Sequence, residues 1–404
     1  MAIFSYVARN PQGKTITGTI DALSEQAAAK TLREQGLTPT TVRTGTVGVV
    51  TRRKKKGKRG RVRLEDMVVI SRQMATMVKA GLPILEGLNI LSEQVEKRAL
   101  KSILGTVEKD VQGGTNLTDS LAKHPKAFDQ FFVSMVRAGE ASGALDSILE
   151  QIAGYLEKVL SIQRKVKSAL MYPAAVSTVA VCITTFLLIK VVPVFQDIFA
   201  GFDVKLPVPT LIVITVSQFL QTNYIKFIVI VIGLYFALMY WGKTKMGRYR
   251  IDSFKLRVPV FGPLLRKVAI AKFTRTLSTL IRCGVNILTA LDIVAKTAGN
   301  VVIEEAVYKT KFSIQGGESL AKPLAESEVF PPMVTRMIDV GERTGALESM
   351  LSKIADFYED QVDAAVAGLT SLIEPLLIVF LGLVVGFIVI SMFLPMFKMV
   401  QAIQ

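Results

Sequence analysis

Few side chains in this sequence could do chemistry on a bound substrate. There is one histidine, His124, and there are two cysteines, Cys182 and Cys283. Cys182 lies inside an apolar run, and neither cysteine has the spacing of a metal ligand, so the sequence predicts no zinc site and no disulfide framework. His124 is followed by Pro125 and is interpreted as an ordinary loop residue.

The tripeptide GKT occurs twice, at residues 13–15 and 242–244. A phosphate-binding loop needs a glycine five residues before the glycine of GK. Ala8 and Ala237 occupy those positions instead, so neither stretch predicts a nucleotide site. We therefore expect no catalytic residue, no cofactor and no metal, and a protein that is not an enzyme.

An acidic corner, by contrast, occurs twice. AGEASGALDSILEQIAGYLE (138–157) returns as VGERTGALESMLSKIADFYE (340–359). Glu140 and Glu342 either accept hydrogen bonds from backbone donors or offer an acidic contact on the surface. The match continues along both halves at an offset of about 200 residues, which predicts a parallel internal duplication. The matching segments are RQMATMVKAGLPILEGL (72–88) with RTLSTLIRCGVNILTAL (275–291), QGGTNL (112–117) with QGGESL (315–320), and PVF (193–195) with PMF (395–397).

Composition narrows the class of protein. Half of the 404 residues are hydrophobic, and the formal net charge is +16. This combination favours a membrane protein that faces anionic lipid or acidic partners, with nucleic-acid binding as the alternative reading of the charge. The first ten residues have no basic segment followed by an apolar core, so we expect no cleavable signal peptide and a chain that starts in the cytoplasm.

Three apolar runs, 174–192, 225–241 and 376–394, are interpreted as membrane spans. The run 208–220 is too short to cross and is interpreted as an interfacial helix. Basic residues before the first span and after the second predict an inner N-terminus, an outer loop between these spans and an outer C-terminal tail. Acidic residues outnumber basic ones before the third span, so the orientation depends on the other flanks.

Within each copy the signals are helical. Gly81 is placed to end one helix and Pro83 to begin the next. In the corner, Gly139 suits a close turn and Ser142 can cap the following helix. Apolar spacing of three and four then predicts one helix from Ser142 to about Val192, about 75 Å long. The glycines interpreted as structural turns are Gly81, Gly139 and Gly143, with counterparts Gly284, Gly341 and Gly345. Such a helix could deliver force into the bilayer, or the corner is only a well-capped helix start.

The sequence divides into eight segments. Residues 1–45 have the alternating pattern of strands, with one capped helix between them. Residues 51–63 contain nine basic residues, which favour contact with anionic headgroups. Nucleic acid is the less favoured partner, because no aromatic residue is interleaved for base stacking. The predicted order is a small α+β module (1–45), a basic linker (51–63), a cytoplasmic bundle (64–168), a span (170–192), a periplasmic loop with an interfacial helix (193–224), a span (225–241), a second bundle (267–372) and a last span (374–394).

These motifs together are similar to one known family. The chain resembles, over its whole length, the inner-membrane platform proteins of type IV pilus assembly and type II secretion. The duplicated AGLPIL/CGVNIL and GEASGAL/GERTGAL motifs, the stretch MYPAAV and the loop PVFQDIFAGFDVKLPVPT carry this resemblance. It implies a mainly α integral membrane protein with two homologous cytoplasmic bundles, three transmembrane helices and a small N-terminal α+β module. The loop prolines are Pro193, Pro207 and Pro209.

The resemblance also implies a function. In such proteins a cytoplasmic hexameric assembly or retraction ATPase engages the bundles, and its movement lifts prepilins or pseudopilins from the bacterial inner membrane. Inner-membrane alignment proteins, anionic lipid and further copies of the chain, as a dimer or higher, are the other implied partners. A pilus system is preferred to secretion because of the basic N-terminal extension. An oligomeric transporter is a more distant alternative, since the spans hold few polar residues.

By motif position, two groups of residues are candidates for coupling. Arg72, Glu140, Arg275 and Glu342 are candidates for contact with the ATPase, with internal ion pairs as the alternative. Tyr172, Pro173, Glu374 and Pro375 mark the membrane boundary in the two copies. Glu374 is either a functional carboxylate or one that reaches the interface.

Overall fold

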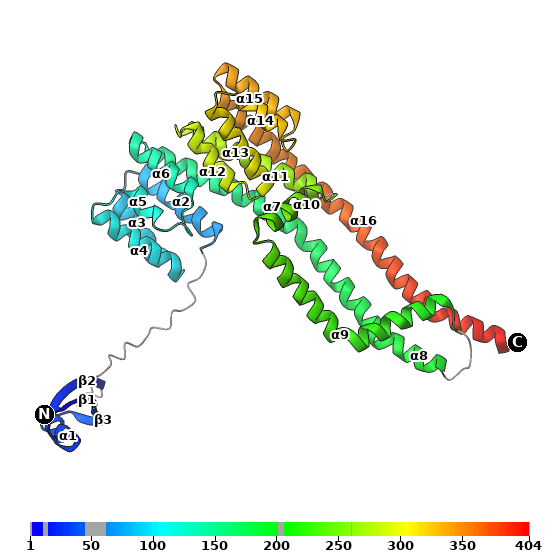
Figure 1. Ribbon diagram of the computed structural model, residues 1–404, viewed down its shortest axis with the longest axis horizontal. Helices are drawn as coiled ribbons and strands as arrows, with labels where there is room; N and C mark the ends of the chain where they lie inside the picture. The colour runs from blue at the N-terminus through cyan, green and yellow to red at the C-terminus, as the bar shows by residue number, and fades with distance from the viewer. Residues whose placement is uncertain (1, 11–14, 45–61, 201–205, 260, 404) are drawn as a thin grey trace. The chain divides into compact units, whose positions relative to one another are not determined.

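The computed structural model of the chain describes residues 2–10, 15–44, 62–200, 206–259 and 261–403. It divides into two compact units, Met1–Arg61 and Val62–Gln404, drawn in Figure 1. Gly13 and Lys14 of the first GKT stretch and most of the predicted basic linker lie outside the described residues.

The first unit is a small sheet with one helix. The strands β1 (Ala2–Arg9), β2 (Thr15–Ala22) and β3 (Thr38–Thr44) form an antiparallel sheet in the order β2-β1-β3. Ser24 begins helix α1 (Glu25–Glu34) by accepting a hydrogen bond from the backbone N of Ala27. Phe4, Ala28 and Leu32 are buried between sheet and helix. The α+β reading of this segment is confirmed.

The second unit contains the same bundle twice. Copy 1 comprises α2 (Leu64–Lys79), α3 (Ile84–Gln94), α4 (Arg98–Gln112), α5 (Leu117–Ala122), α6 (Gln130–Ser142) and the start of α7 (Leu145–Phe186). Copy 2 comprises α11 (Phe261–Arg282), α12 (Ile287–Thr297), α13 (Val301–Gln315), α14 (Ala321–Glu326), α15 (Pro332–Thr344) and the start of α16 (Leu347–Ile403). The predicted duplication is therefore confirmed, and one apolar core runs through both copies.

Local sequence explains where these helices start and stop. Gly81 adopts φ +86°, and the next helix begins directly after Pro83. Asn116 caps α5 by accepting from the backbone N of Asp119. Gly284 repeats the conformation of Gly81 in copy 2 with φ +74°. Both repeats thus use glycine where an L side chain would be strained.

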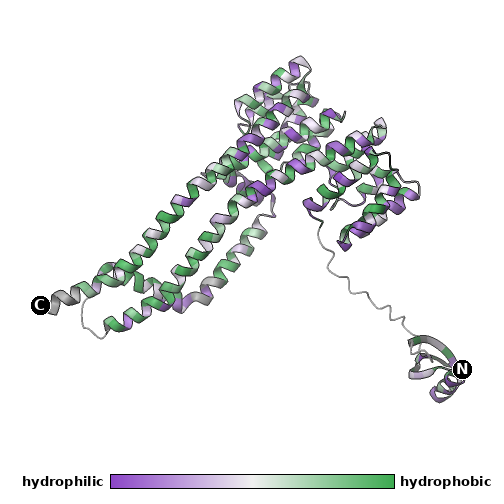
Figure 2. Cartoon of the chain, turned by 180° about the vertical axis from the view of Figure 1, so that it is seen from behind, coloured by the Kyte–Doolittle hydropathy of each residue, from purple (hydrophilic) through white to green (hydrophobic). Residues whose placement is uncertain are grey.

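Each bundle passes into a long apolar helix. α7 continues through a π-helical turn, η1 (Leu187–Val191), into α8 (Val192–Ala200), and α16 runs for 57 residues, about 85 Å. The runs 145–199 and 347–397 are long and apolar enough to cross a membrane, and only 17% of the most apolar window of each is buried. Figure 2 shows their hydrophobic colouring beyond the bundles. A buried core helix would hide this surface, so these two helices are candidate membrane spans by length, composition and exposure.

The third predicted span belongs to α9 (Val208–Trp241), which is followed by α10 (Lys245–Arg257). Within the described residues, α9 offers a shorter apolar run, Val229–Trp241. The interfacial helix expected at 208–220 is instead the first half of this single helix. The crossing at 225–241 stays a prediction.

Two sequence-based expectations for the corner are wrong. Ser142 is the last residue of α6 rather than the cap of α7, which begins at Leu145 after Ala144 without a side-chain cap. Gly139 lies inside α6, not in a turn, and Gly143, with φ +70°, is the residue that turns the chain. A glycine can serve either a positive φ or a close helix contact, and the sequence pattern does not distinguish them.

The segment after the first span is also more helical than expected. Pro193 lies in α8 rather than in a loop, and the predicted loop is helical except at Leu206 and Pro207 among its described residues. Proline disrupts a helix because it lacks an N–H and crowds the carbonyl four residues earlier. Here the backbone N of Val192 bonds the carbonyl of Leu187, five residues back, so the helix is already wound in the wider π form where the proline enters.

Candidate functional site

The corner between α6 and α7 depends on close helix packing. A Cβ built on Gly139 would lie 3.1 Å from Ile148 and from Leu145 of α7. In copy 2 a Cβ on Gly341 would lie 3.0 Å from the Cα of Leu347 and from a side-chain carbon of Met350. Both glycines therefore let the helix before the corner touch the helix after it, which fixes the direction in which the long helix leaves the bundle.

Glu140 is occupied inside the bundle. Its carboxylate accepts hydrogen bonds from the backbone N of Leu117 at 2.7 Å and of Thr118 at 3.0 Å, and from the hydroxyl of Thr118. Glu342 accepts from the backbone N of Leu320 at 3.0 Å. A carboxylate at these positions satisfies orphan N–H groups and complements the positive end of the short helices α5 and α14. Of the two readings kept open from the sequence, the geometry favours the backbone acceptor.

Arg72 ties α2 to the long helix of its own copy. Its Nε and Nη2 donate to the two carboxylate oxygens of Glu157 at 2.7 and 2.6 Å, and its Nη1 donates to Glu150 at 2.6 Å. The hydrogen bonds from Arg72 hold the pKa of Glu157 below its ordinary value, against a smaller opposing effect of burial. Arg72 is thus an internal ion-pair partner, in the bidentate geometry that is strongest for arginine.

Copy 2 repeats this clamp in a more buried form. Nε of Arg275 donates to Glu359 at 2.8 Å, and the guanidinium also pairs with Asp356. Burial lowers the pKa of Arg275, but the hydrogen bonds to Glu359 and Asp356 outweigh it, so the pKa is raised. The two arginines among the predicted coupling residues, Arg72 and Arg275, therefore occupy matching places, on the helices α2 and α11 that brace α7 and α16.

The two bundles contact each other through these long helices. The hydroxyls of Tyr155 on α7 and Thr276 on α11 are 2.9 Å apart in a buried contact. Lys158 forms an ion pair with Glu359 at 3.1 Å, and Lys165 forms one with Asp363 at 2.6 Å. None of these partners was found from the sequence. Glu157 and Glu359 could have been noticed, because they follow the duplicated corner at the same distance in both copies.

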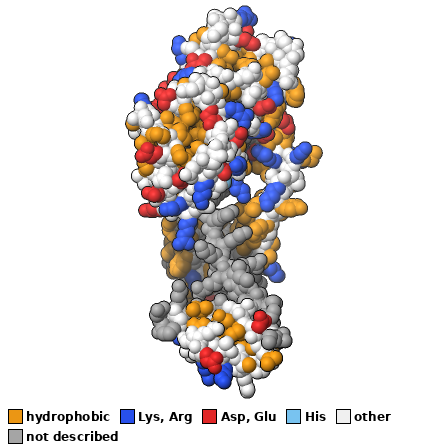
Figure 3. Space-filling view, turned by 90° about the vertical axis from the view of Figure 1, so that its left-hand side faces the viewer, with side chains coloured by type: hydrophobic (Ala, Val, Ile, Leu, Met, Phe, Trp, Pro, Cys, Tyr) orange, Lys and Arg blue, Asp and Glu red, His pale blue; other side chains and the backbone are white. Residues whose placement is uncertain are grey.

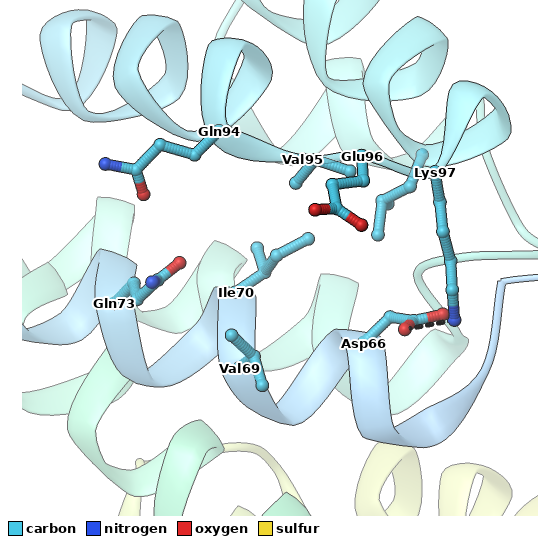
Figure 4. Close-up of a pocket in the computed structure, with 9 residues that line it drawn as sticks. Asp66, Val69, Ile70, Gln73, Gln94, Val95, Glu96 and Lys97 are labelled. Atoms are coloured by element: carbon cyan, nitrogen blue, oxygen red, sulfur yellow. Dashed lines mark hydrogen bonds and ion pairs between the residues drawn. The ribbon is translucent and has the colours of Figure 1, made fainter.

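A groove of about 230 Å³ marks this junction on the surface, where α7 meets α11. Its basic lining residues are Lys158, Arg275 and Arg282, and each of them is paired with an acidic side chain. A second pocket, of about 310 Å³, lies in copy 1 between α2 and the α3–α4 connection. Figure 4 shows Ile70 of α2 pointing toward Val95 and Glu96, and Val69 and Gln73 of the same helix also line the pocket.

In the part of the chain that the structure describes, no group of three or more His, Cys, Asp and Glu residues could hold a metal ion. Figure 3 shows acidic and basic side chains interspersed over the visible face of the bundles, without one dominant sign. The arrangement offers ion-paired helix contacts rather than a set of converging catalytic groups.

The predicted membrane-boundary residues lie on the long helices. Tyr172 is exposed and Pro173 lies inside α7, while Glu374 is exposed and Pro375 lies inside α16. Of the three predicted loop prolines, Pro193 lies in α8, and the other two lie at the start of α9. Pro207 precedes α9, and Pro209 lies in its first turn, where a missing N–H costs nothing. All of these predicted positions therefore fall at or within the apolar helices.

Sequence reasoning missed a contact among the apolar helices themselves. Val192, Val213, Ile214, Ile388 and Met392 form a small buried cluster between α8, α9 and α16. Two hydroxyls of α9 bond backbone carbonyls of its neighbours: Thr210 to Ser391 at 2.5 Å, and Ser217 to Leu188. Thr210 and Ser217 are seven residues apart on one helix face, a spacing that could have indicated a packed helix rather than an interfacial one.

The fold and these contacts define a class: a duplicated helical protein in which each bundle is braced against a long apolar helix. The chain belongs to the family described as type II secretion system (T2SS), protein F, whose sequence model matches residues 70–193 and 273–395. A second model, of the N-terminal domain of that protein, matches residues 1–43. The matched ranges coincide with the two copies and the small N-terminal unit, and the family suspected from the sequence is confirmed.

Several relatives match over at least 96% of their length. The chain is 45% identical over 405 residues to a type IV pilus assembly protein PilC of Thermus thermophilus, covering 100% of both chains. It is 43% identical to a PilC of Myxococcus xanthus, covering 100% of this chain and 96% of the relative. A type II secretion system protein F of Pseudomonas aeruginosa is 34% identical, with 100% of both chains covered.

Proposed function

We propose that this protein is an inner-membrane platform protein of type IV pilus assembly, which couples a cytoplasmic ATPase to the extraction and polymerisation of pilin subunits. One observation carries the preference for the pilus: full-length identity is 45% and 43% to relatives named for pilus assembly, against 34% to one named for secretion. The equivalent platform of a type II secretion system is the second candidate, because relatives of that name also match the whole chain.

The proposed topology has three crossings, with the bundles inside and the C-terminus outside. The long apolar helices support two of the crossings, and the apolar second half of α9 supports the third. Lys243, Lys245 and Arg248 follow α9, which favours an inner location for that end. The same helices and the family membership support an inner-membrane location.

Coupling in this proposal is mechanical rather than chemical. An ATPase that moved a bundle would move its long helix, because Arg72 and Arg275 clamp the brace helices α2 and α11 to α7 and α16. The role is accordingly non-enzymatic, with no cofactor. The proposed partners are the ATPase, the pilins, the alignment proteins of the same machine, anionic lipid and further copies of the chain.

The experiment is a deletion in the bacterium that encodes this chain, complemented with the native gene. Surface pili and secreted exoproteins are measured in parallel. We expect loss and recovery of pili with unchanged secretion. Loss of secretion with intact pili would instead assign the protein to a secretion system, and an unchanged phenotype in both would overturn the platform role.

Topology has its own test. In a chain freed of native cysteines by Cys182→Ala and Cys283→Ala, single cysteines are placed at Asp197 and at Lys243. An impermeant maleimide added to intact cells is expected to label the first and to reach the second only after the inner membrane is opened. Labelling of Lys243→Cys in intact cells would contradict the proposed orientation.

A further inference from the structure

The contact between the two bundles is made by different surfaces of the same repeat. Copy 1 contributes α6 and α7: Tyr155 meets Thr276, and Gln130 accepts from Lys296 at 2.9 Å. Copy 2 contributes α11, α12 and, through Glu359, α16. Such a contact is heterologous. Among the described residues, the α11–α12 face of copy 2 is covered by copy 1, but the equivalent α2–α3 face of copy 1 is not covered in this way. Likewise, the α6–α7 face of copy 1 is covered by copy 2, but the equivalent α15–α16 face of copy 2 is not.

The position equivalent to Tyr155 shows this on copy 2. Tyr155 is 6% exposed because α11 covers it, whereas Phe357, its counterpart on α16, is 45% exposed. Met333 and Val340 of the adjoining helix α15 are exposed as well. An aromatic side chain of similar size is thus buried against a bundle in one copy and lies on the surface of the other.

The receiving face shows the complementary difference. Thr276 of α11 is fully buried under copy 1, whereas Gln73, the counterpart on α2, is exposed. Lys272 is half-buried and its counterpart Val69 is 54% exposed. The pocket of about 310 Å³ in Figure 4 is lined by both Val69 and Gln73. Copy 2 receives Tyr155 at Thr276. At the equivalent position of copy 1, Gln73, an open pocket lies on the surface instead.

We propose that a second copy of this chain docks there, with Phe357 of one chain against Val69 and Gln73 of α2 in the next. The contact repeats between chains the one that already joins the two bundles within a chain. This deepens the self-association included in the proposed function and rests on it only for the assumption that several chains meet in one membrane.

The equivalent side chains fit this contact. Within the chain, burial lowers the pKa of Lys272, and the charge of Asp129 opposes this effect. Between chains the same two positions would hold Val69 and Pro331, so two apolar side chains replace two charged ones. Apolar burial is favourable and needs no exact partner geometry.

The charged rim of the contact differs between the two settings. Within the chain, Lys158 of copy 1 forms an ion pair with Glu359. The equivalent positions between chains are Asp360 and Glu157, and the guanidinium of Arg72 already donates to Glu157 and Glu150. The proposed contact therefore depends on its apolar side chains and not on its rim.

The direction of the long helices allows the repetition. α7 and α16 contact each other and leave the bundles in the same direction, as Figures 1 and 2 show. The operation that carries copy 1 onto copy 2 thus keeps the apolar helices pointing the same way. Applied again, it places the next chain in the same bilayer, either closing a ring or extending a row.

Disulfide trapping between two tagged chains tests the proposal. Both chains lack native cysteines through Cys182→Ala and Cys283→Ala. One carries Val69→Cys and the other Phe357→Cys, and they are coexpressed and oxidised in native membranes. We expect a disulfide between the two tags. Phe312→Cys, at another exposed phenylalanine of copy 2, is paired with Val69→Cys as the matched control and is expected to give none.

Two outcomes would overturn the proposal. One is the absence of the Val69–Phe357 cross-link in a membrane where pili still form, which would leave the proposed function standing. The other is efficient linkage of Phe357→Cys to itself, which would show that like faces meet. As a second measurement, Phe357→Glu in the full chain should lower the oligomeric mass at unchanged thermal stability, and Phe312→Glu should not. An unchanged mass with Phe357→Glu also contradicts the interface.

Discussion

Arg72 donates two parallel hydrogen bonds to the carboxylate of Glu157, and the duplication reproduces this pair as Arg275 with Glu359. The two pairs differ in exposure: the side chain of Glu157 is 42% exposed and that of Glu359 is 12% exposed. Glu359 also forms an ion pair with Lys158 of copy 1, so the Arg275–Glu359 pair stabilises both its own bundle and the junction between the bundles. The same clamp thus has unequal importance in the two copies.

Removing the two carboxylates should have unequal effects on stability. Glu157→Gln is expected to cost about 0.5–1 kcal/mol, because solvent screens an exposed pair. Glu359→Gln is expected to cost about 1–3 kcal/mol, because it leaves a half-buried guanidinium with one carboxylate fewer. Chemical unfolding of the full chain in detergent measures both. Glu305→Gln, at an exposed glutamate of α13, is the control, and equal costs for Glu157 and Glu359 would contradict the argument.

The clamp of copy 1 also predicts a pH dependence. The pKa of Glu157 is lowered from its ordinary value of 4.5 by the hydrogen bonds from Arg72. A lowered folded-state pKa contributes stability that is fully present above the unfolded pKa and is lost as the pH falls through the folded value. The stability difference between the native chain and Glu157→Gln should therefore be constant above about pH 5.5 and shrink below about pH 4.5. A difference that grows on acidification would have the wrong sign.

Gly139, Gly143 and Gly154 should respond differently to alanine. Gly139→Ala places a methyl group 3.1 Å from Ile148 and is expected to cost about 1–3 kcal/mol through overpacking. A Cβ at position 143 would have no atom within 4 Å, but Gly143 adopts φ +70°, which strains an L residue. Gly143→Ala is therefore expected to lower the free energy of unfolding by about 1 kcal/mol. Gly154 lies inside α7 with nothing within 4 Å of a Cβ, so Gly154→Ala should stabilise by about 0.5–1 kcal/mol. Thermal unfolding ranks the three, and a neutral Gly139→Ala would refute the close crossing of α6 and α7.

The corner shows which features the sequence could predict. Helix ends set by neighbours in the chain, such as the end of α2 at Gly81 and the start of α3 after Pro83, follow from local rules and are as expected. The partner of Glu140 lies 23 residues away in the sequence and is brought near only by packing. Tyr155 and Phe357 have similar side chains at equivalent positions, yet one is buried and the other exposed. Periodicity gives each bundle the same faces and does not say which of them meet.

The apolar helices show a second limit of prediction from the sequence. Hydropathy located the apolar helices, since length and composition suffice for that. The sequence-based prediction placed Pro193 in the loop after the first predicted span. The π turn that precedes this proline in the helix has no simple sequence signature. The hydroxyl contacts of Thr210 and Ser217 depend on which helices become neighbours, which no local pattern specifies.

The last prediction separates a structural role of Glu140 from direct contact with an ATPase. Glu140→Ala removes the acceptor of the backbone N–H groups of Leu117 and Thr118, so hydrogen exchange at these amides should accelerate about tenfold, the equivalent of about 1.4 kcal/mol. Glu86→Ala, at an exposed glutamate of α3, should leave them unchanged.

Binding of the assembly ATPase to the full chain in nanodiscs is measured on the same variants. If Glu140 acts only as a cap, Glu140→Gln, which keeps one acceptor oxygen, should bind the ATPase as the native chain does while showing part of the exchange effect. A loss of binding in Glu140→Gln with normal protection of Leu117 and Thr118 would instead place the carboxylate in the contact with the ATPase. Hydrogen exchange at Leu117 and Thr118 distinguishes the capping role from the ATPase contact, because only the capping role makes the protection of these amides depend on Glu140.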